Sequence, residues 1–225
     1  MQQLIVAAVL WLGLHIGVSG TSLRGAIAGK LGEQGFRGLF SVASIAIFAF
    51  LIYAYSHATR TTLWLAPLWL RWILVACMLP ASFLLLASFA TVSIKPEDAG
   101  TRRGEPRGVL RITRHPMMCA FAIWSAVHVI GTGEASDLVF FGAFLITAVA
   151  GMPSIDRKYA MRAPEGWRKF AAETSILPGG AILAGRNRLV LPEIGWLPPL
   201  LSIALWLLLL YAHQKVIGVA PVPLP

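Results

Sequence analysis

The sequence predicts an all-α membrane protein in which about six transmembrane helices form one bundle and one domain, residues 1–225. Of its 225 residues, 57% are hydrophobic and only 13% are charged, whereas a soluble domain has about 25% charged residues. The mean hydropathy is +0.71. Several apolar runs reach the roughly 18–20 residues that cross a bilayer core. The chain therefore has too little charge to cover a soluble globule.

The expected helices follow from the apolar runs, which lie near residues 3–20, 38–58, 68–92, 116–132, 137–155 and 197–217. The first run begins with MQQ, has no positive segment before it and no A-x-A cleavage site after it. We therefore expect a retained helix rather than a signal peptide. Only GTGEAS separates the fourth run from the fifth, which predicts a tight helical hairpin.

The longest segment outside these runs contains APEGWRKFAAETS. Pro164 lies near its start and LPGG follows it, a pattern typical of a helix bounded by proline and glycine. The mixture of aromatic and basic residues in GWRKF predicts that this helix, near residues 163–176, lies on the cytoplasmic interface of the membrane.

The distribution of basic residues predicts how the chain crosses the membrane. Alternate connecting segments hold 16 of the 19 lysines and arginines, and the other side holds only Arg60, Arg71 and Lys215. Because basic loops remain in the cytoplasm, both termini are expected on the non-cytoplasmic side of an inner membrane. The net charge of +9 is thus a topology signal that also favours anionic membrane lipid, and no nucleic-acid partner is expected.

The five histidines differ in their expected depth. His57 and His213 lie near the outer ends of their helices and His115 lies where the fourth run begins, so these three are expected to be interfacial groups that reach water. His15 and His128 lie inside apolar runs, each about twelve residues, or ~18 Å, from the point where its helix enters the membrane. Because the two helices enter from opposite faces, both imidazoles are expected near the midplane, within ~6 Å in depth.

Ionisable groups at that depth are costly and usually mark function. The alternative is that each imidazole only hydrogen-bonds a neighbouring helix. Each has a tryptophan one turn earlier and a serine on the same face, Trp11 and Ser19 for His15, Trp124 and Ser125 for His128. Haem suits two neutral imidazoles on facing helices best, because its iron accepts one on each side. Zinc is disfavoured because it needs about four ligands. The sequence has no Cys-x-x-Cys-His motif for covalent attachment of haem, so the candidate is non-covalent haem b. Simple packing is the alternative.

Three segments of the chain resemble the NnrU family, bacterial membrane proteins named for an association with nitrite and nitric oxide reduction. They are LHIGVSGTSLRG, RGVLRITRHPMMCAFAIWSAVH, and GWRKFAAETSILP with the later Gly185–Arg186. The family includes the plant and cyanobacterial isomerase of 15-cis-ζ-carotene. Since the segments span nearly the whole chain, the resemblance implies a single NnrU-type transmembrane domain.

The resemblance implies a haem b-dependent cis–trans isomerase in which His15 and His128 are both the axial ligands and the catalytic residues, with Trp11 and Trp124 shaping the pocket. It implies a polyene substrate from the bilayer, first of all 15-cis-ζ-carotene, and a redox partner that keeps the haem reduced. One ligand would be released so that iron engages the polyene. A cysteine that the plant isomerase has three residues before its second histidine is replaced by Ser125, so a thiolate-based switch has no counterpart in this chain.

Three further residues are expected near the inner rim of the haem. Arg24 lies about two turns beyond His15, and Arg114 and His115 lie just before the fourth helix. They are expected to pair with haem propionates or, alternatively, to anchor their helices at lipid headgroups.

Two other functions stay open. Family members in denitrifying bacteria suggest a haem-binding protein that supports nitrite and nitric oxide reduction without isomerase activity. RITRHP also resembles the Arg-His-Pro motif of the isoprenylcysteine carboxyl methyltransferases, membrane enzymes that use S-adenosylmethionine. Against this second alternative, the aromatic residue that follows their motif is Met117 or Met118 here, and their paired glutamates reduce to Asp156.

Overall fold

The computed structural model describes residues 1–90 and 104–222, and within these ranges the chain forms helices and connecting turns but no strand. The all-α class is therefore confirmed. In chain order the helices are α1 (Gln2–Leu12), the π-helix η1 (Gly13–Val18), α2 (Leu23–Ser56), α3 (Leu68–Ala90), the 3₁₀-helix η3 (Gly108–Arg111), α4 (Pro116–Thr132), α5 (Ala135–Arg162), α6 (Pro164–Glu173), α7 (Gly180–Leu183), α8 (Leu191–Ile194) and α9 (Leu197–Ile217).

Six apolar helices make up the bundle. Helices α2, α3, α5 and α9 are long and apolar enough to cross a membrane, and two shorter apolar helices, Gln2–Val18 and Pro116–Thr132, complete the set among the described residues. Together they match the six predicted runs and confirm a helical membrane bundle. Large apolar side chains such as Val42, Ile45 and Trp69 remain exposed on its outside, as expected where hydrocarbon is the solvent.

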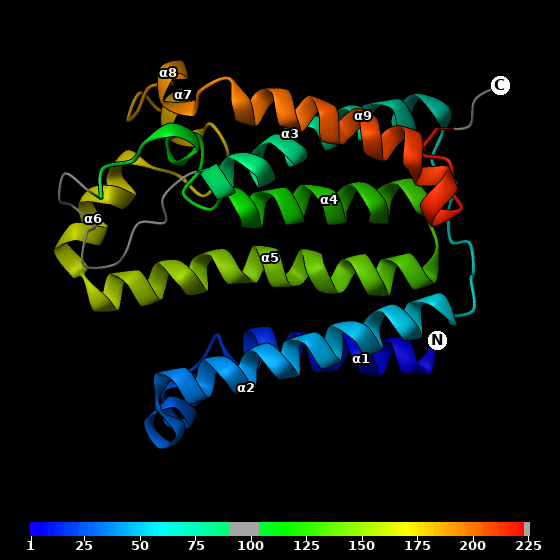
Figure 1. Cartoon of the computed structure of the whole chain (residues 1–225), viewed down its shortest axis with the longest axis horizontal. Coiled ribbons are helices and arrows are strands. Elements are labelled where there is room, and N and C mark those ends of the chain that lie inside the picture. The colour runs from blue at the N-terminus through cyan, green and yellow to red at the C-terminus, as the bar shows by residue number, and fades with distance from the viewer. Residues whose placement is uncertain (91–103, 223–225) are drawn as a thin grey trace.

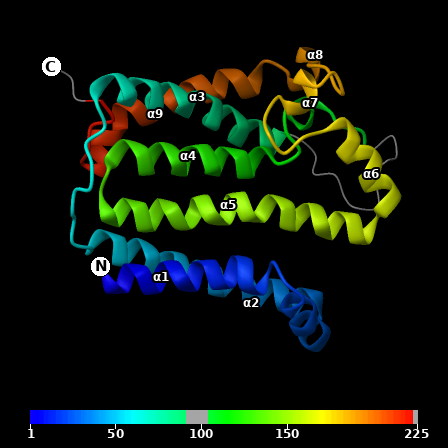
Figure 2. The same cartoon turned by 180° about the vertical axis from the view of Figure 1, so that it is seen from behind.

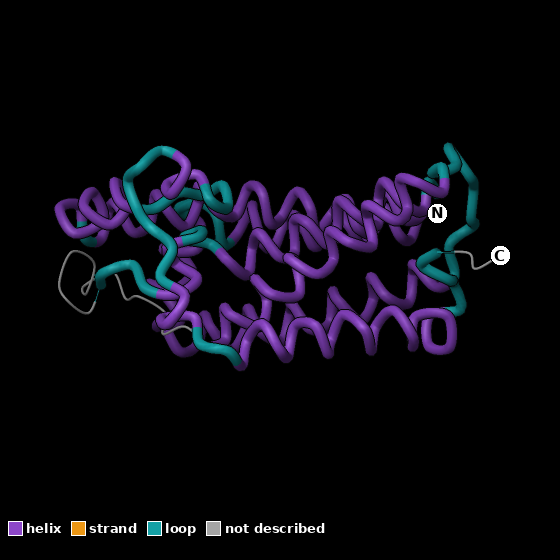
Figure 3. Tube along the Cα trace, turned by 90° about the horizontal axis from the view of Figure 1, so that it is seen from above, coloured by secondary structure: helices purple, strands orange, loops and turns teal. Residues whose placement is uncertain are grey.

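Helix α5 lies at the centre of the arrangement. It packs against α4 on one side and against α1 on the other, while α3 packs on α4 and α9 packs on α3 (Figures 1 and 2). Seen from above, all the long helices run along one axis (Figure 3). One buried cluster joins α1, α2 and α5 through Leu4, Leu51 and Phe140, and a second includes Leu84 of α3 and Met152 of α5. The central helix therefore contacts both halves of the bundle.

Proline and glycine set the ends of α4. Pro116 occupies its first turn, where the missing N–H costs nothing. Gly133 ends the helix with a φ of 68°, a left-handed conformation that glycine adopts without strain. Helix α5 then begins at Ala135, so the tight hairpin predicted between the fourth and fifth runs is confirmed.

The second helix is longer than the sequence predicts. The apolar pattern predicts a helix over residues 38–58, whereas α2 begins at Leu23. The preceding residues lack an apolar run, but many of them, including the lysine and glutamate of GKLGEQG, are good helix formers. Gly32, with φ 72° and ψ 164°, interrupts the helical conformation. A kink therefore joins a polar arm to the apolar arm that packs in the bundle.

The two ends of the bundle differ. At the end where α1 begins and α9 finishes, called the terminal end below, the Leu63 N–H donates to the Gly133 carbonyl at 2.7 Å and the Ala135 N–H donates to the Thr61 carbonyl at 2.9 Å. These bonds tie the α2–α3 connection to the α4–α5 turn. The opposite end, called the basic end, carries α6, α7 and α8 (Figure 1). Helix α6 lies where a helix near residues 163–176 is expected, and its place on the cytoplasmic surface stays a prediction.

Candidate functional site

His15 lies in the middle of the π-helix η1. Hydrogen bonds in a π-helix run from residue i to residue i−5, as from the Ser19 N–H to the Leu14 carbonyl at 3.0 Å. The Nδ1 atom of His15 lies 3.0 Å from the Trp11 carbonyl oxygen. Since a carbonyl only accepts, Nδ1 donates and Nε2 keeps its lone pair. Short π-helical segments are frequent at functional sites, so the local backbone marks His15 independently of its side chain.

His128 lies one turn before the end of α4 and makes the same local bond, from Nδ1 to the Trp124 carbonyl oxygen at 2.7 Å. Its ring stacks on Phe141 of α5, with ring centroids 4.5 Å apart and an interplanar angle of 25°. Within the described ranges, no residue hydrogen-bonds Nε2 of His15 or of His128. Both imidazoles therefore present an unprotonated nitrogen, the form that binds a metal.

A continuous row of rings, called the aromatic seam below, runs between the two histidines and comprises His15, Trp11, Phe144, Trp124 and His128. The ring centroids of Trp11 and His15 are 3.9 Å apart, and those of Trp11 and Phe144 are 5.0 Å apart. Trp124 continues the row at 5.6 Å from Phe144 and 5.3 Å from His128. All five side chains are half-buried. Each ring of the seam therefore keeps part of its surface exposed.

The contacts with α5 place His15 and His128 at different levels of the bundle. His128 stacks on Phe141, whereas Trp11, on which His15 stacks, donates from Nε1 to the Thr147 Oγ1 at 3.1 Å. Thr147 follows Phe141 by six positions, about 9 Å along an α-helix. The expectation of similar depth is therefore wrong. The reason is that α4 ends at Thr132, close after His128, whereas the π-helix with His15 follows the full length of α1 from the same end.

This arrangement does not bring His15 and His128 to one metal. Two imidazoles on one metal have ring centroids roughly 5 to 6.5 Å apart, because each metal–nitrogen distance is about 2.0–2.1 Å. No ring contact joins His15 to His128 in the part of the chain that the structure describes, and Phe144 fills the space between the two tryptophans. The donor atoms have the right chemistry for haem iron, but the spacing of this pair does not fit it.

The two serines predicted at the site have different surroundings. Ser125 of α4 is fully buried, and its Oγ has no hydrogen-bond partner among the described residues. Ser19 follows the π-helix, is half-buried, and its carbonyl oxygen accepts a hydrogen bond from the Lys158 Nζ at 2.5 Å. Only Ser125 therefore combines burial with an unused polar atom, one turn from His128.

The three residues expected to bind haem propionates are paired with carboxylates of the protein. Arg24 donates from Nη1 and Nη2 to Glu33 at 2.8 and 2.6 Å. Arg114 and His115 share Asp156 of α5, through Nη2 and Nε2 respectively, each at 2.7 Å. His115 is buried. Arg114 and His115 thus join the start of α4 to α5. Their role in propionate binding stays a prediction, which these contacts do not favour because both side chains already bond a carboxylate.

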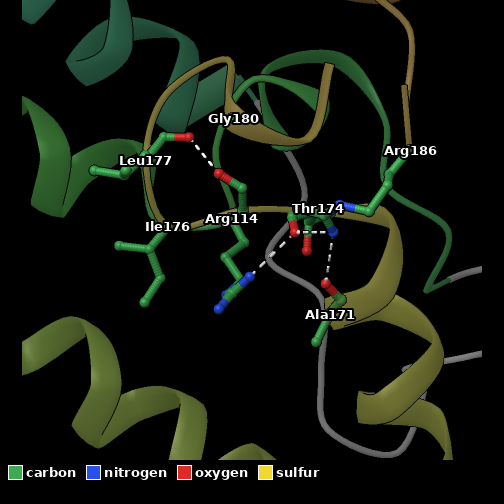
Figure 4. Close-up of a pocket in the computed structure, with 8 residues that line it drawn as sticks. Arg114, Ala171, Thr174, Ile176, Leu177, Gly180 and Arg186 are labelled. Atoms are coloured by element: carbon green, nitrogen blue, oxygen red, sulfur yellow. Dashed lines mark hydrogen bonds between the residues drawn. The ribbon is translucent and has the colours of Figure 1, made fainter. Parts of the chain in front are cut away.

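An open hollow lies beside this cluster at the basic end (Figure 4). Arg114 and Arg186 approach it from different segments, and both donate to the Thr174 carbonyl oxygen, at 3.3 and 3.1 Å. Arg186 also donates to the Ala172 carbonyl oxygen at 2.5 Å. Both guanidinium groups therefore donate some of their N–H groups to backbone oxygens of the protein. The hollow is thus less suited to an anionic cofactor than the Arg-His-Pro motif alone suggests.

Three parts of the site escape the sequence analysis. Phe144 and Thr147 reach Trp11 because α1 packs on α5, a long-range contact without a local signal, although the run FFGAF could have pointed to an aromatic surface on α5. His213, expected to be an interfacial group, has its ring centroid 6.3 Å from that of His128. The packing of α9 against α3, which itself packs against α4, creates that proximity.

Two plant proteins named 15-cis-zeta-carotene isomerase, chloroplastic are similar to the chain. The protein from Arabidopsis thaliana is 27% identical over 195 residues, which cover 84% of this chain and 52% of that protein. The protein from Zea mays is 24% identical over 196 residues, which cover 83% and 52%. The chain thus spans about half the length of these curated relatives.

No solved structure matches the chain. The sequence profile described as NnrU protein, in contrast, matches residues 3–221. This range contains the π-helix, the whole aromatic seam and His213. The chain therefore belongs to the NnrU family.

Proposed function

We propose that the protein isomerises a cis double bond of a polyene dissolved in the membrane, with the central bond of 15-cis-ζ-carotene as its substrate. The observation that carries the proposal is the similarity, over 84% of the chain, to a protein named 15-cis-zeta-carotene isomerase. The reaction changes a double-bond geometry and no oxidation state. It therefore needs a site that binds a flat hydrocarbon and lets one bond rotate.

The aromatic seam has the physical properties that such a site requires. A carotene has no polar group and partitions into the bilayer, so its site must lie within the spanning helices and be open to lipid. The seam lies there, with Trp11, Phe144 and Trp124 half-buried. Rings of this kind pack against a flat conjugated chain and favour positive charge above their faces, which stabilises a polarised, twisted double bond.

Haem b is the cofactor that we propose with this activity, with a redox partner that keeps it reduced. The unprotonated Nε2 atoms support a haem iron as far as donor chemistry is concerned. The spacing of His15 and His128 does not support one iron held by both, and we therefore derive no catalytic step through the metal.

Expression in a bacterial host that accumulates 15-cis-ζ-carotene tests the proposed activity. We expect cells that make this protein to convert the 15-cis isomer into the 15-trans form, as resolved by chromatography of extracted carotenoids. His128→Ala should lose most of the conversion because it removes an end of the seam, whereas His57→Ala should keep it. An unchanged isomer profile, with full-length protein present in the membrane fraction, would contradict the proposal.

A further inference from the structure

Basic side chains from two helices gather around one carboxylate at the basic end of the bundle. Arg24 and Arg37 belong to α2, which also carries the carboxylate of Glu33. Lys158 and Arg162 lie one turn apart on the same face of α5. The charges of both α2 arginines and of Arg162 act on Glu33, and those of Arg24 and Arg162 act on Lys158. These five side chains, called the basic cluster below, lie on segments that share one end of the bundle in both views (Figures 1 and 2).

Two of the four cations of the basic cluster have partners in the protein. Arg24 donates to both carboxylate oxygens of Glu33, at 2.8 and 2.6 Å, and its Cζ lies 5.1 Å from the ring centroid of Phe36. The Lys158 Nζ donates at 2.5 Å to the carbonyl oxygen of Ser19, which ends the π-helix. These contacts fix one guanidinium and one ammonium group beside the kink of α2.

The other two cations, Arg37 and Arg162, have no such partner. Both residues are exposed, and neither guanidinium group donates a hydrogen bond or forms an ion pair with any residue that the structure describes. Glu33 supplies one negative charge against four positive charges, and Arg24 already binds both of its oxygens. Like charges held close together repel, and an anion bound between them removes that repulsion. The basic cluster therefore suits an anion that the described part of the protein does not supply.

The positions of the two unpaired arginines place the basic cluster at the membrane surface. Arg37 directly precedes the apolar run that begins near residue 38, and Arg162 is the last residue of α5. The 28 residues of α5 extend over about 42 Å, longer than a hydrocarbon core of about 30 Å. Beyond Arg37, Leu39 and Val42 of α2 are 55% and 67% exposed. An anion bound at the cluster therefore lies beside an apolar surface that continues into the membrane.

We propose that the basic cluster binds the phosphate group of an anionic phospholipid, whose acyl chains lie along the apolar part of α2. Phosphate suits guanidinium groups because its oxygens accept two parallel N–H bonds. An amphiphile matches both the charge at Arg37 and the exposed Leu39 and Val42, whereas a soluble phosphate leaves the apolar surface unused. The net charge of +9 predicts only a general attraction to anionic lipid, and the basic cluster gives that attraction one site. The inference is independent of any isomerase activity.

Thermal unfolding of the delipidated full-length protein in a neutral detergent tests the site, because a ligand of the folded state raises the unfolding midpoint. The protein is titrated separately with phosphatidylglycerol, phosphatidylcholine and inorganic phosphate. The site variant is Arg37→Gln/Arg162→Gln, which removes two exposed charges. Arg168→Gln/Arg188→Gln is the matched control. It removes two other exposed arginines from the segments of the basic end, whose side chains bond no described residue.

We expect phosphatidylglycerol to raise the wild-type midpoint at lower concentrations than phosphatidylcholine, and inorganic phosphate to have little effect. The site variant should need roughly 25-fold more phosphatidylglycerol for half of the rise, because each basic residue beside anionic lipid contributes about fivefold in affinity. The control variant should match the wild type. Arg37→Lys/Arg162→Lys should lie between the wild type and the site variant, because lysine keeps the charge but loses the paired N–H bonds.

The midpoint without lipid separates a lost site from a misfolded chain. The site variant should then unfold at the wild-type midpoint or slightly above it, because the substitutions remove charge repulsion and no contact with a described residue. A site variant that matches the wild type without lipid, but responds weakly to phosphatidylglycerol, has lost the binding site alone.

Four results would overturn the inference. The first is the same response to phosphatidylglycerol in the site variant and the wild type. The second is an equal loss of response in the control variant, which assigns the attraction to net charge rather than to the basic cluster. The third is an equal effect of the two lipids on the wild type. The fourth is an effect of inorganic phosphate as large as that of phosphatidylglycerol, which identifies a soluble anion as the ligand. None of these readouts uses isomerisation or haem, so each leaves the proposed function untouched.

Discussion

Three histidines of this chain have imidazoles that are oriented by a carbonyl one turn earlier. The bonds are His15 to Trp11, His57 to Tyr53 and His128 to Trp124, at 3.0, 2.8 and 2.7 Å. In a helix the carbonyl of residue i−4 has a second lone pair that a side chain at residue i can reach. The shared bond fixes Nδ1 as the donor, so neighbouring rings rather than tautomers distinguish the three histidines.

Gly133 should be the least replaceable glycine of the bundle. A Cβ added there would lie 2.0 Å from the Trp64 carbonyl oxygen, and its φ of 68° is left-handed. We expect Gly133→Ala to lower the thermal unfolding midpoint in detergent strongly. Gly185→Ala is the control, since Gly185 has the same φ but open space around its Cβ; it should cost only the backbone strain of about 1–2 kcal/mol. Equal midpoints for the two variants would contradict the close packing at Gly133.

The Asp156 cluster should matter for stability. The side chains of Arg114 and Asp156 are 13% and 15% exposed, and removal of one partner of a buried ion pair costs about 3 kcal/mol or more. We expect Asp156→Asn to lower the unfolding midpoint clearly. Glu33→Gln breaks the Arg24 pair, in which the glutamate side chain is 55% exposed, and should have a much smaller effect. If both variants have the same unfolding midpoint, the Asp156 cluster does not stabilise the contact between α4 and α5.

At the scale of single residues, the sequence predicts part of the site. His15, His128 and their tryptophans can be found from their depth in apolar runs, because hydrocarbon makes a buried imidazole conspicuous. His213 cannot be found in this way, because its closeness to His128 depends on how α9 packs against α3. The partners of Arg24 and Arg114 are also tertiary contacts, and neither carboxylate lies within one helical turn of its arginine.

Helices that pattern alone does not predict contribute to the site. The π-helix Gly13–Val18 has the same apolar sequence character as α1, so periodicity cannot separate the two. Gly32 likewise looks like an ordinary loop glycine, but it joins two helical arms in α2. The ends of α4 and the short turn before α5 can be predicted, because Pro116 and Gly133 have local conformational preferences.

The junction between α8 and η3 should become less stable as the pH falls. Glu193 accepts from Arg111 at 2.7 and 2.9 Å and from the Gly108 N–H at 2.9 Å. These donors, chiefly the guanidinium, lower the pKa of Glu193 from 4.5 to about 2. A carboxylate with a lowered pKa stabilises the folded junction above its unfolded pKa, and this stability is lost as pH falls from 4.5 towards 2.

Hydrogen-exchange protection factors of α8 and η3, measured across this pH range, check the prediction. Protection in wild-type protein should decline as pH falls, while protection of α5 should not follow the same curve. Glu193→Gln should be weakly protected in both segments at every pH, because it lacks the titrating carboxylate. Constant wild-type protection down to the lower limit of the range would show that the junction does not depend on this charge.

The six apolar helices and their single axis are the features of the whole molecule that composition predicts best. Alternating apolar and basic segments predict the number of crossings without tertiary information. The relative depth of two residues on different helices is harder to predict from the sequence, because it depends on where each helix begins at the membrane. Helix α4, Pro116–Thr132, is much shorter than α5, Ala135–Arg162, and this difference moves His128 towards the terminal end.

The orientation of the whole bundle can be tested with reporter fusions. We expect an alkaline phosphatase reporter, which is active only outside the cytoplasm, to be active when it follows residue 222 and inactive when it is inserted after Gly185, where the exposed basic end lies. The reason is the concentration of arginine and lysine in the segments at that end. High activity at Gly185 and none at the C-terminal fusion would reverse the predicted topology.

The most direct test of the account is isomerisation by the purified protein in liposomes that contain 15-cis-ζ-carotene. The protein is reconstituted with reduced haem, and chromatography follows the isomer over time. We expect conversion to the 15-trans isomer at a rate that rises with the amount of protein and falls severely in His128→Ala. If well-folded, haem-loaded wild-type protein leaves the isomer ratio the same as in empty liposomes, the chain is not a ζ-carotene isomerase.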